Sequence, residues 1–336
     1  MSVQSTGSNT HRVRKVLVVG AGASRDCDFP LGSELVPMLL SPLRSLCPWL
    51  IQDNDDLAGL EHGRRAFIKA CRDTTYGSID ELLHRRKDLR AAGALSLAAA
   101  LVSKQLEVVH GRKTHKQWHE SLYLELFRQS SQWNSLPLLD ATNQTTVVTF
   151  NYDLNIEVAI ARHLEADSGI DPASAWEHAT DCPIHHVHGL LDMHEVIASM
   201  LSDESVRIDV DISVIQRAAR LLGLATDDAE QLDADALNMA RKAVWEASEI
   251  AFIGFGFDLR NLDRIGIGKA HPRWVNGSRS ILATTQGMSA KALDAAVEQM
   301  GCPIDAVQDP FRLSSVVSSF LAGIDDRTFR ANRYPR

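Results

Sequence analysis

The stretch that decides the fold is KVLVVGAGAS at residues 15–24, near the start of a chain of 336 residues. Its first six residues are an apolar, β-branched run that ends in glycine, which predicts a buried parallel strand. The small residues that follow predict a tight turn into a helix over 33–40. Such a turn lets the backbone approach a pyrophosphate, whose oxygens its N–H groups bind. Because the third glycine of the usual dinucleotide motif is absent, a plain strand-to-helix turn is the alternative interpretation.

Four later segments repeat this strand pattern. They are 145–150 (TTVVTF), a segment that ends at 185–189 (HHVHG), 250–255 (IAFIGF) and 280–284 (SILAT). Helical patterns separate them, including 154–164 and a helix that Ser289 caps and Gly301 ends. Strands that alternate with helices indicate a parallel sheet between two helical layers. The sequence therefore predicts an α/β fold with a Rossmann-like parallel sheet covered by helices on both faces.

Two long segments, 50–136 and 190–248, contain no comparable strand, and their apolar residues recur at helical spacing. We predict that they are helical insertions in a single domain that spans residues 1–336. The last residues, 325–336, are basic. We expect them to form a short surface tail.

Composition limits the classes of function. The formal net charge of −8 argues against a protein whose main task is to grip nucleic acid, because neutralising phosphates needs a basic surface. The five cysteines form no C-x-x-C pair, so neither a disulfide framework nor a zinc ribbon is indicated. No apolar stretch reaches the roughly 20 residues that span a bilayer, and the polar N-terminus lacks the apolar core of a signal peptide. We expect a cytoplasmic protein with no membrane association and no direct nucleic-acid binding.

An asparagine and an aspartate follow the second predicted strand directly, in the motif Phe150-Asn151-Tyr152-Asp153. In doubly wound sheets, ligands bind at the carboxyl ends of strands. An amide in this place holds a water or a ribose hydroxyl without adding charge beside a developing oxocarbenium ion. The alternative is that Asn151 caps the following helix.

Two histidines, His186 and His188, lie at the end of the third predicted strand. Side chains alternate along a strand, so we expect these two on the same side and His185 on the other. Histidine suits proton transfer near neutral pH. The alternatives are a metal site with His178 and Cys182, whose spacing matches no familiar zinc pattern, or a set of satisfied polar residues.

A second glycine-rich turn, Gly254-Phe255-Gly256, follows the fourth predicted strand, with Asp258 close behind. The glycines again allow a nucleotide to approach the backbone, and the acid is a possible acceptor for ribose or adenine. Each of these motifs alone has a plain structural explanation. Together they place four polar or glycine-rich motifs at four predicted strand ends, which favours a nucleotide site there.

In chain order these motifs resemble the sirtuin family, specifically its bacterial NADase branch found in anti-phage defence. The resemblance extends from about residue 16 to residue 285. It implies that Asn151 positions the nicotinamide ribose and its attacking group, and that His188 is the catalytic histidine. The residues that it implies for cofactor binding are Gly20, Ala21, Gly22, Ala23, Ser24, Asp153, Gly254, Phe255, Gly256 and, as a looser match with its neighbour Thr284, Thr285.

The chain also departs from the protein deacetylases of that family. They have paired zinc cysteines, which are absent here, and an aspartate-phenylalanine-arginine run after an isoleucine-proline, where this chain has Phe29-Pro30-Leu31-Gly32. Because the zinc module and its cleft bind the acetyl-lysine peptide, the resemblance implies an enzyme without zinc that consumes NAD as its substrate.

The resemblance thus implies an NAD+ hydrolase that cleaves the nicotinamide–ribose bond and gives nicotinamide and ADP-ribose. Two alternatives remain: a sensor that binds NAD or ADP-ribose, and an NAD-dependent protein deacylase or ADP-ribosyltransferase. A free-running NADase would harm its host, so we expect gated activity. By analogy with the defence branch, we expect a homo-oligomer, a separately encoded ATPase or Argonaute-like partner, or both.

Overall fold

The computed structural model describes most of the chain. The described residues are 14–51, 54–73, 79–111, 118–127, 145–203, 209–223, 234–277, 279–285, 288–307, 317 and 320–321. The expected basic tail at 325–336 lies outside them.

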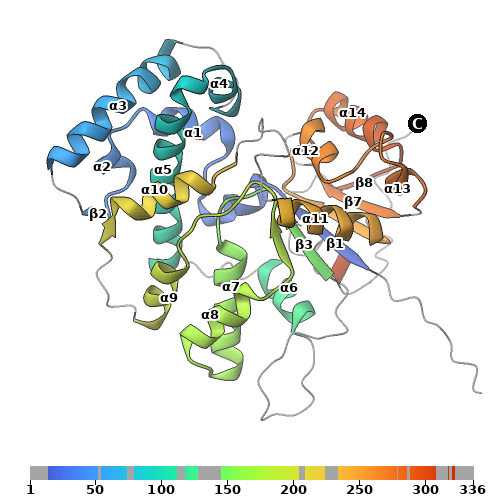
Figure 1. Cartoon of the computed structure of the whole chain (residues 1–336). Helices are drawn as coiled ribbons and strands as arrows, with labels where there is room; N and C mark the ends of the chain where they lie inside the picture. The colour runs from blue at the N-terminus through green and yellow to red at the C-terminus, as the bar shows by residue number, and fades with distance from the viewer. Residues whose placement is uncertain are drawn as a thin grey trace, which may run out of the picture.

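A six-stranded parallel sheet forms the centre of the described chain, in the order β4-β3-β1-β6-β7-β8 (Figure 1). The strands are β1 (Lys15–Val19), β3 (Thr145–Thr149), β4 (Ile184–His186), β6 (Glu249–Ile253), β7 (Ser280–Thr284) and β8 (Asp305–Val307). The prediction of an α/β fold with a Rossmann-like parallel sheet is therefore confirmed. Strand β1 lies in the middle of the sheet, with β3 and β4 on one side and β6, β7 and β8 on the other.

Both faces of the sheet are buried, as the continuous apolar runs predict. In β1, Leu17 and Val19 belong to one hydrophobic core, and Val16 and Val18 belong to the other. The first core continues into α5, α6, α7 and α8, and the second into α11, α12, α13 and α14. Alternation along a single strand therefore builds two cores with the sheet between them.

The helices have the following bounds. They are α1 (Gly32–Leu39), α2 (Leu43–Leu46), α3 (Asn54–Asp73), α4 (Ile79–Arg85), α5 (Arg90–His110), α6 (Trp118–Leu126), α7 (Asn155–Ser168), α8 (Pro172–Thr180), α9 (His194–Ser202), α10 (Ile212–Leu221), α11 (Ala234–Glu246), α12 (Leu259–Arg264), α13 (Pro272–Val275) and α14 (Ala290–Met300), with 3-10 helices η1 (Ala21–Cys27) and η2 (Lys87–Leu89). The predicted end signals of α14 are confirmed: the Ser289 hydroxyl accepts from Ala292 N at 3.2 Å, and Gly301 has a φ of 69°.

Parts of the two predicted insertions pack against each other, whereas α11 of the second insertion packs on the sheet against β4. Their described residues are mainly helical, and α10 packs against α5 (Figure 1). They also share a short parallel pair, β2 (Leu50–Ile51) with β5 (Val210–Asp211), which strand patterns do not predict because each strand has only two residues. The stretch Lys87–His110, which contains α5, is long and apolar enough to cross a membrane, but 78% of its apolar window is buried within the fold.

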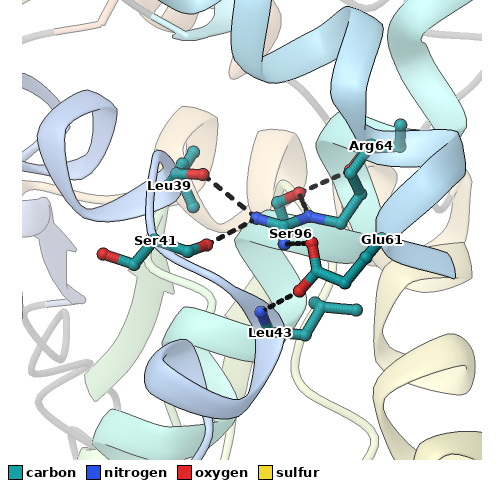
Figure 2. Close-up of polar contacts among 7 residues, drawn as sticks. Leu39, Ser41, Leu43, Glu61, Arg64 and Ser96 are labelled. Carbon is teal, nitrogen blue, oxygen red and sulfur yellow. Dashed lines mark hydrogen bonds and ion pairs between the residues drawn. The ribbon is translucent and has the colours of Figure 1, made fainter. Parts of the chain in front are cut away.

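A buried arginine ties α1 to this helical group (Figure 2). Arg64 on α3 has no exposed surface, and its Nη2 donates to the carbonyls of Leu39 at 3.1 Å and Ser41 at 3.0 Å. Its Nε donates to Ser96 Oγ on α5 at 2.7 Å, and its Nη1 pairs with Glu61 at 2.8 Å. The guanidinium thus fixes the end of α1 against α3 and α5. This matters for function because α1 forms one wall of the cavity described next.

Candidate active site

A cavity of about 240 Å³ opens at the carboxyl ends of β1, β3 and β6. Eight of the twelve predicted site residues line it: Gly20, Ala21, Ser24, Asn151, Asp153, His188, Phe255 and Gly256. Helices α1, α4 and α5 supply part of the wall through Leu35, Asp80 and Leu101. Motifs from three strand ends and from the turn after β4 therefore converge on one space, as the strand-end rule predicts.

Gly22, Ala23, Gly254 and Thr285 do not line this cavity. The two glycine-rich turns lie against each other instead: Gly22 N donates to Gly254 O at 3.0 Å, and a Cβ on Gly20 would lie 2.7 Å from Gly254 O. At Gly254, which has a φ of 57°, a Cβ would lie 2.1 Å from Ala23 N. Close contact between the two protein turns therefore already requires these small residues. Ala23 and Thr285 are buried.

The end of β7 also supports this contact. Thr284 Oγ1 accepts from Gly254 N at 2.9 Å and so holds the second glycine-rich turn from behind. The three strand ends β1, β6 and β7 are thereby joined through main-chain and hydroxyl contacts. This arrangement gives the cavity a rigid floor.

Asn151 is fixed by two hydrogen bonds from its amide nitrogen. Nδ2 donates to Gly20 O at 3.1 Å and to Ser24 Oγ at 2.8 Å. A carbonyl only accepts, so the Gly20 contact identifies the nitrogen and leaves Oδ1 as the amide's acceptor. Asn151 is 7% exposed, and its Oδ1 makes no hydrogen bond to any described residue. The capping alternative is wrong, because the N-cap of α7 is Leu154.

Asp153 is a buried carboxyl group in the same wall. Its Oδ2 accepts from Ser24 Oγ at 2.8 Å, and its Oδ1 accepts from Asn155 N at 3.3 Å. Burial raises the pKa of Asp153 to about 6, although the Ser24 and Asn155 hydrogen bonds and nearby His186 oppose that rise. A carboxyl group with such a pKa changes its charge close to neutral pH.

His186 and His188 do not share one side of a strand, contrary to the expectation from alternation. Strand β4 ends at His186, and the chain turns at the next two residues, so the alternation rule stops applying there. His186 lies between Asn151 O, 3.0 Å from Nδ1, and Glu157 Oε1, 2.8 Å from Nε2. Burial lowers the pKa of His186, but Glu157 and the Asn151 carbonyl outweigh burial and raise it. His186 therefore supports the backbone of Asn151 from outside the cavity.

His188 lines the cavity, and Arg264 holds its ring. Arg264 Nη1 lies 2.9 Å from His188 Nε2, and both side chains are buried. The ring also packs edge-on against Phe150, with centroids 5.1 Å apart. Because arginine stays protonated and donates, Nε2 must accept, so the neutral ring carries its proton on Nδ1.

Several residues of the site were not among the predicted site residues, including four with ionisable side chains. Arg264 lies 76 positions from His188, and nothing in its local sequence marks it as a partner. Asp258 was noted as a possible acceptor, and it lines the cavity and caps α12 by accepting from Arg260 N at 2.9 Å. Tyr152, which lines the cavity and donates to Gly223 O at 2.6 Å, and Asp80 complete the set. Only tertiary packing brings Asp80 and Arg264 to the strand ends.

Metal ligation was a weaker alternative for the histidine cluster. Within the described part of the chain, no group of three or more His, Cys, Asp or Glu side chains is placed to hold a metal ion. Cys182 does lie near His178, but its thiol contacts the main-chain oxygen of that residue at 3.6 Å. Burial raises the pKa of Cys182 to about 12.

No protein-family model and no curated protein matches this chain.

Proposed function

We propose that this protein is an NAD+ hydrolase that cleaves the nicotinamide–ribose bond and releases nicotinamide and ADP-ribose. The observation that carries the proposal is Asn151: a buried amide at a strand end, with its nitrogen fixed by the protein and its oxygen left for a ligand in the cavity. Such an oxygen accepts from a ribose hydroxyl or a water and adds no charge of its own. His188 lines the same cavity and would contact the same ribose.

The electrostatics of the cavity support a cationic ligand group. Its described lining includes Asp80, Asp153 and Asp258 but no lysine or arginine. The nicotinamide ring of NAD+ is positively charged, and positive charge moves onto the ribose as the glycosidic bond loosens. The buried Asp153, when ionised, favours both charges, whereas Asp80 and Asp258 are partly exposed and Asp258 pairs with Arg260 at 3.0 Å. Phe150 and Phe255 supply apolar surface for the ring.

The size of the cavity indicates which part of NAD it takes. At about 240 Å³ it is smaller than the roughly 300–1,000 Å³ of typical small-molecule sites. We therefore place the nicotinamide and its ribose inside, next to Asn151 and His188. The pyrophosphate would lie at the Ala21 backbone, because the N–H groups of Gly20, Gly22 and Ala23 already donate within the protein. The adenosine half would extend along the strand ends.

The test is nicotinamide release from NAD by the purified full chain, measured by mass spectrometry. Asn151→Ala and His188→Ala should each lower turnover by at least about 10²-fold, the scale of a lost positioned catalytic group. Asn276→Ala is the matched control, because Asn276 is an exposed asparagine directly after α13 that does not line the cavity. Wild-type turnover in either cavity variant would contradict the proposal.

A sensor that binds NAD or ADP-ribose without cleaving it is the second candidate. The bond from Arg264 to His188 Nε2 favours it, because that nitrogen is occupied and accepts no proton while the bond persists. Calorimetry that detects NAD binding by a chain that releases no nicotinamide would support the sensor. An NAD-dependent protein deacylase or ADP-ribosyltransferase would instead transfer label from NAD to a protein.

We also propose, from the sequence resemblance, that the enzyme depletes NAD in anti-phage defence. Gating by self-assembly or by an ATPase or Argonaute-like partner belongs to the same proposal. The cavity wall formed by α1, α4 and α5 offers a route, since a partner bound to this helical group would move residues that line the cavity.

A further inference from the structure

We infer that Asp153, and not the His188 ring, accepts the proton of the water that attacks the ribose. The inference rests on the proposed NAD hydrolysis and names the base of that same site. It gives Asp153 a catalytic role beyond the cofactor contact expected from its motif.

The first observation concerns His188. A histidine acts as a base through an unprotonated ring nitrogen, and in the neutral ring only one nitrogen has that lone pair. Here the lone pair is on Nε2, which accepts from the buried guanidinium of Arg264 at 2.9 Å. Protonating Nε2 would break this bond and place two cations side by side. Nε2 of His188 is therefore poorly suited to taking up a proton.

The second observation concerns Asp153. A carboxylate offers about four acceptor positions. Its hydrogen bonds to described residues use one on each oxygen, from Ser24 Oγ and from Asn155 N. The residue lines the cavity, and Ser24 Oγ joins it to Asn151 through two contacts of 2.8 Å. A water held by Asn151 Oδ1 would thus lie close to the carboxylate.

The charges around Asp153 suit this task. Burial raises its pKa to about 6, with Glu157 on α7 adding to the rise and His186 on β4 opposing it. On the cavity side lie Asp80 of α4, Asp258 at the start of α12 and the His188–Arg264 pair. A base whose pKa is near the working pH combines the ionised state with useful basicity.

The reaction balances without a further reactant. The C1′–N bond breaks, and its electron pair returns to the ring nitrogen, which makes nicotinamide neutral. The water oxygen forms the new bond to C1′, one of its protons passes to the Asp153 carboxylate and then to solvent, and the other remains on the new hydroxyl. NAD+ and water thus give nicotinamide, ADP-ribose and one proton.

The experiment is a single-turnover measurement with the full chain in excess over NAD, from pH 5 to pH 8. The wild-type rate should rise with pH and level off above about 6, the pKa of Asp153. Asp153→Asn should lower the plateau rate by about 10² to 10⁴-fold and abolish this rise. Asp294→Asn, at an exposed position on α14, is the matched control and should keep the wild-type profile.

Ser24→Ala provides the second variant. It removes a hydrogen bond that favours the ionised carboxylate, so it should shift the rise in rate to higher pH. A purely structural role for Asp153 would not produce this shift. Thermal unfolding of each variant confirms that the rates refer to folded protein.

The outcomes separate the two proposals. Wild-type protein that releases no nicotinamide would overturn the proposed function and the role of Asp153 with it. Wild-type turnover that Asp153→Asn retains would overturn only the role of Asp153. A pH dependence that persists in Asp153→Asn and disappears in His188→Asn would assign the proton to the histidine.

Discussion

Two buried polar clusters in this protein differ in one respect. The arginine cluster, Arg64 with Glu61, Ser96 and the carbonyls of Leu39 and Ser41, uses the Nε, Nη1 and Nη2 nitrogens of its guanidinium within the protein (Figure 2). The strand-end cluster, Ser24 with Asn151 and Asp153, is as deeply buried. Its Asn151 oxygen, however, makes no hydrogen bond to any described residue, and Asn151 lines a cavity.

The difference separates a structural from a functional polar cluster. Burying polar groups is costly unless they are bonded, so a cluster that serves the fold closes on itself. A cluster that serves a ligand keeps an acceptor open and tolerates a carboxyl group whose pKa burial has raised. Burial alone does not distinguish them. What distinguishes them is whether a hydrogen-bonding atom is left without a protein partner, beside a cavity that can hold a ligand.

The largest expected loss of stability comes from a change in the arginine cluster. Arg64→Leu leaves Glu61 without its ion-pair partner and the carbonyls of Leu39 and Ser41 without the guanidinium. We expect the free energy of unfolding to fall by about 3–5 kcal/mol. Urea unfolding measures the loss. The neighbouring Arg65→Leu is the matched control, because Arg65 is exposed. If the two variants lose the same free energy of unfolding, the arginine cluster does not have the structural role that sets it apart from the strand-end cluster.

The next effect tests the floor beneath the strand-end cluster. Gly254→Ala places a Cβ 2.1 Å from Ala23 N at a φ of 57°. We expect a loss of about 2–4 kcal/mol in the free energy of unfolding. In Gly256→Ala the new Cβ would have no heavy atom within 4 Å, so its loss should be much smaller. A tolerated Gly254→Ala would show that the two turns do not need their close contact.

The smallest expected effect is a gain in stability, from a change at Asp153. Because burial raises the pKa of Asp153 from 3.8 to about 6, the folded state binds more protons than the unfolded state between these values. The stability contributed by this group is therefore complete below 3.8 and is lost as pH rises through about 6. A shift of about two pKa units corresponds to about 3 kcal/mol, and Asp153→Asn removes this loss but weakens the hydrogen bonds from Ser24 and Asn155. We expect a net rise of about 1 kcal/mol in the free energy of unfolding at pH 7.

Urea unfolding of both proteins at several values between pH 4 and pH 7.5 measures this difference. The gain should shrink toward the acidic end, where Asp153 of the wild type is neutral. If the variant is less stable than wild type at pH 7, the hydrogen bonds of the Asp153 carboxylate stabilise the fold by more than the burial of its charge destabilises it. A gain in stability with a loss of turnover would mark Asp153 as functional rather than structural.

The strands that sequence reasoning found are the ones with long apolar runs. Strands β1, β3, β6 and β7 lie where the pattern predicts them, because burial on both faces requires continuous apolar residues. Strand β8 and the β2–β5 pair have two or three residues each, too few for a pattern to detect. Strand β4 ends before the predicted point, because a turn begins after His186.

The sequence by itself determined the α/β class, the buried strand before the first glycine-rich turn and the polar residues at strand ends, because hydrophobic periodicity and the position of a residue after a strand are local properties. Only the tertiary structure decided which of these residues meet. Three features join segments that lie far apart in the chain. They are the Arg264 bond to His188, the contact between the turns at Gly20 and Gly254, and the place of Asp80 in the cavity wall. Such contacts depend on how whole elements pack, and no local pattern encodes that packing.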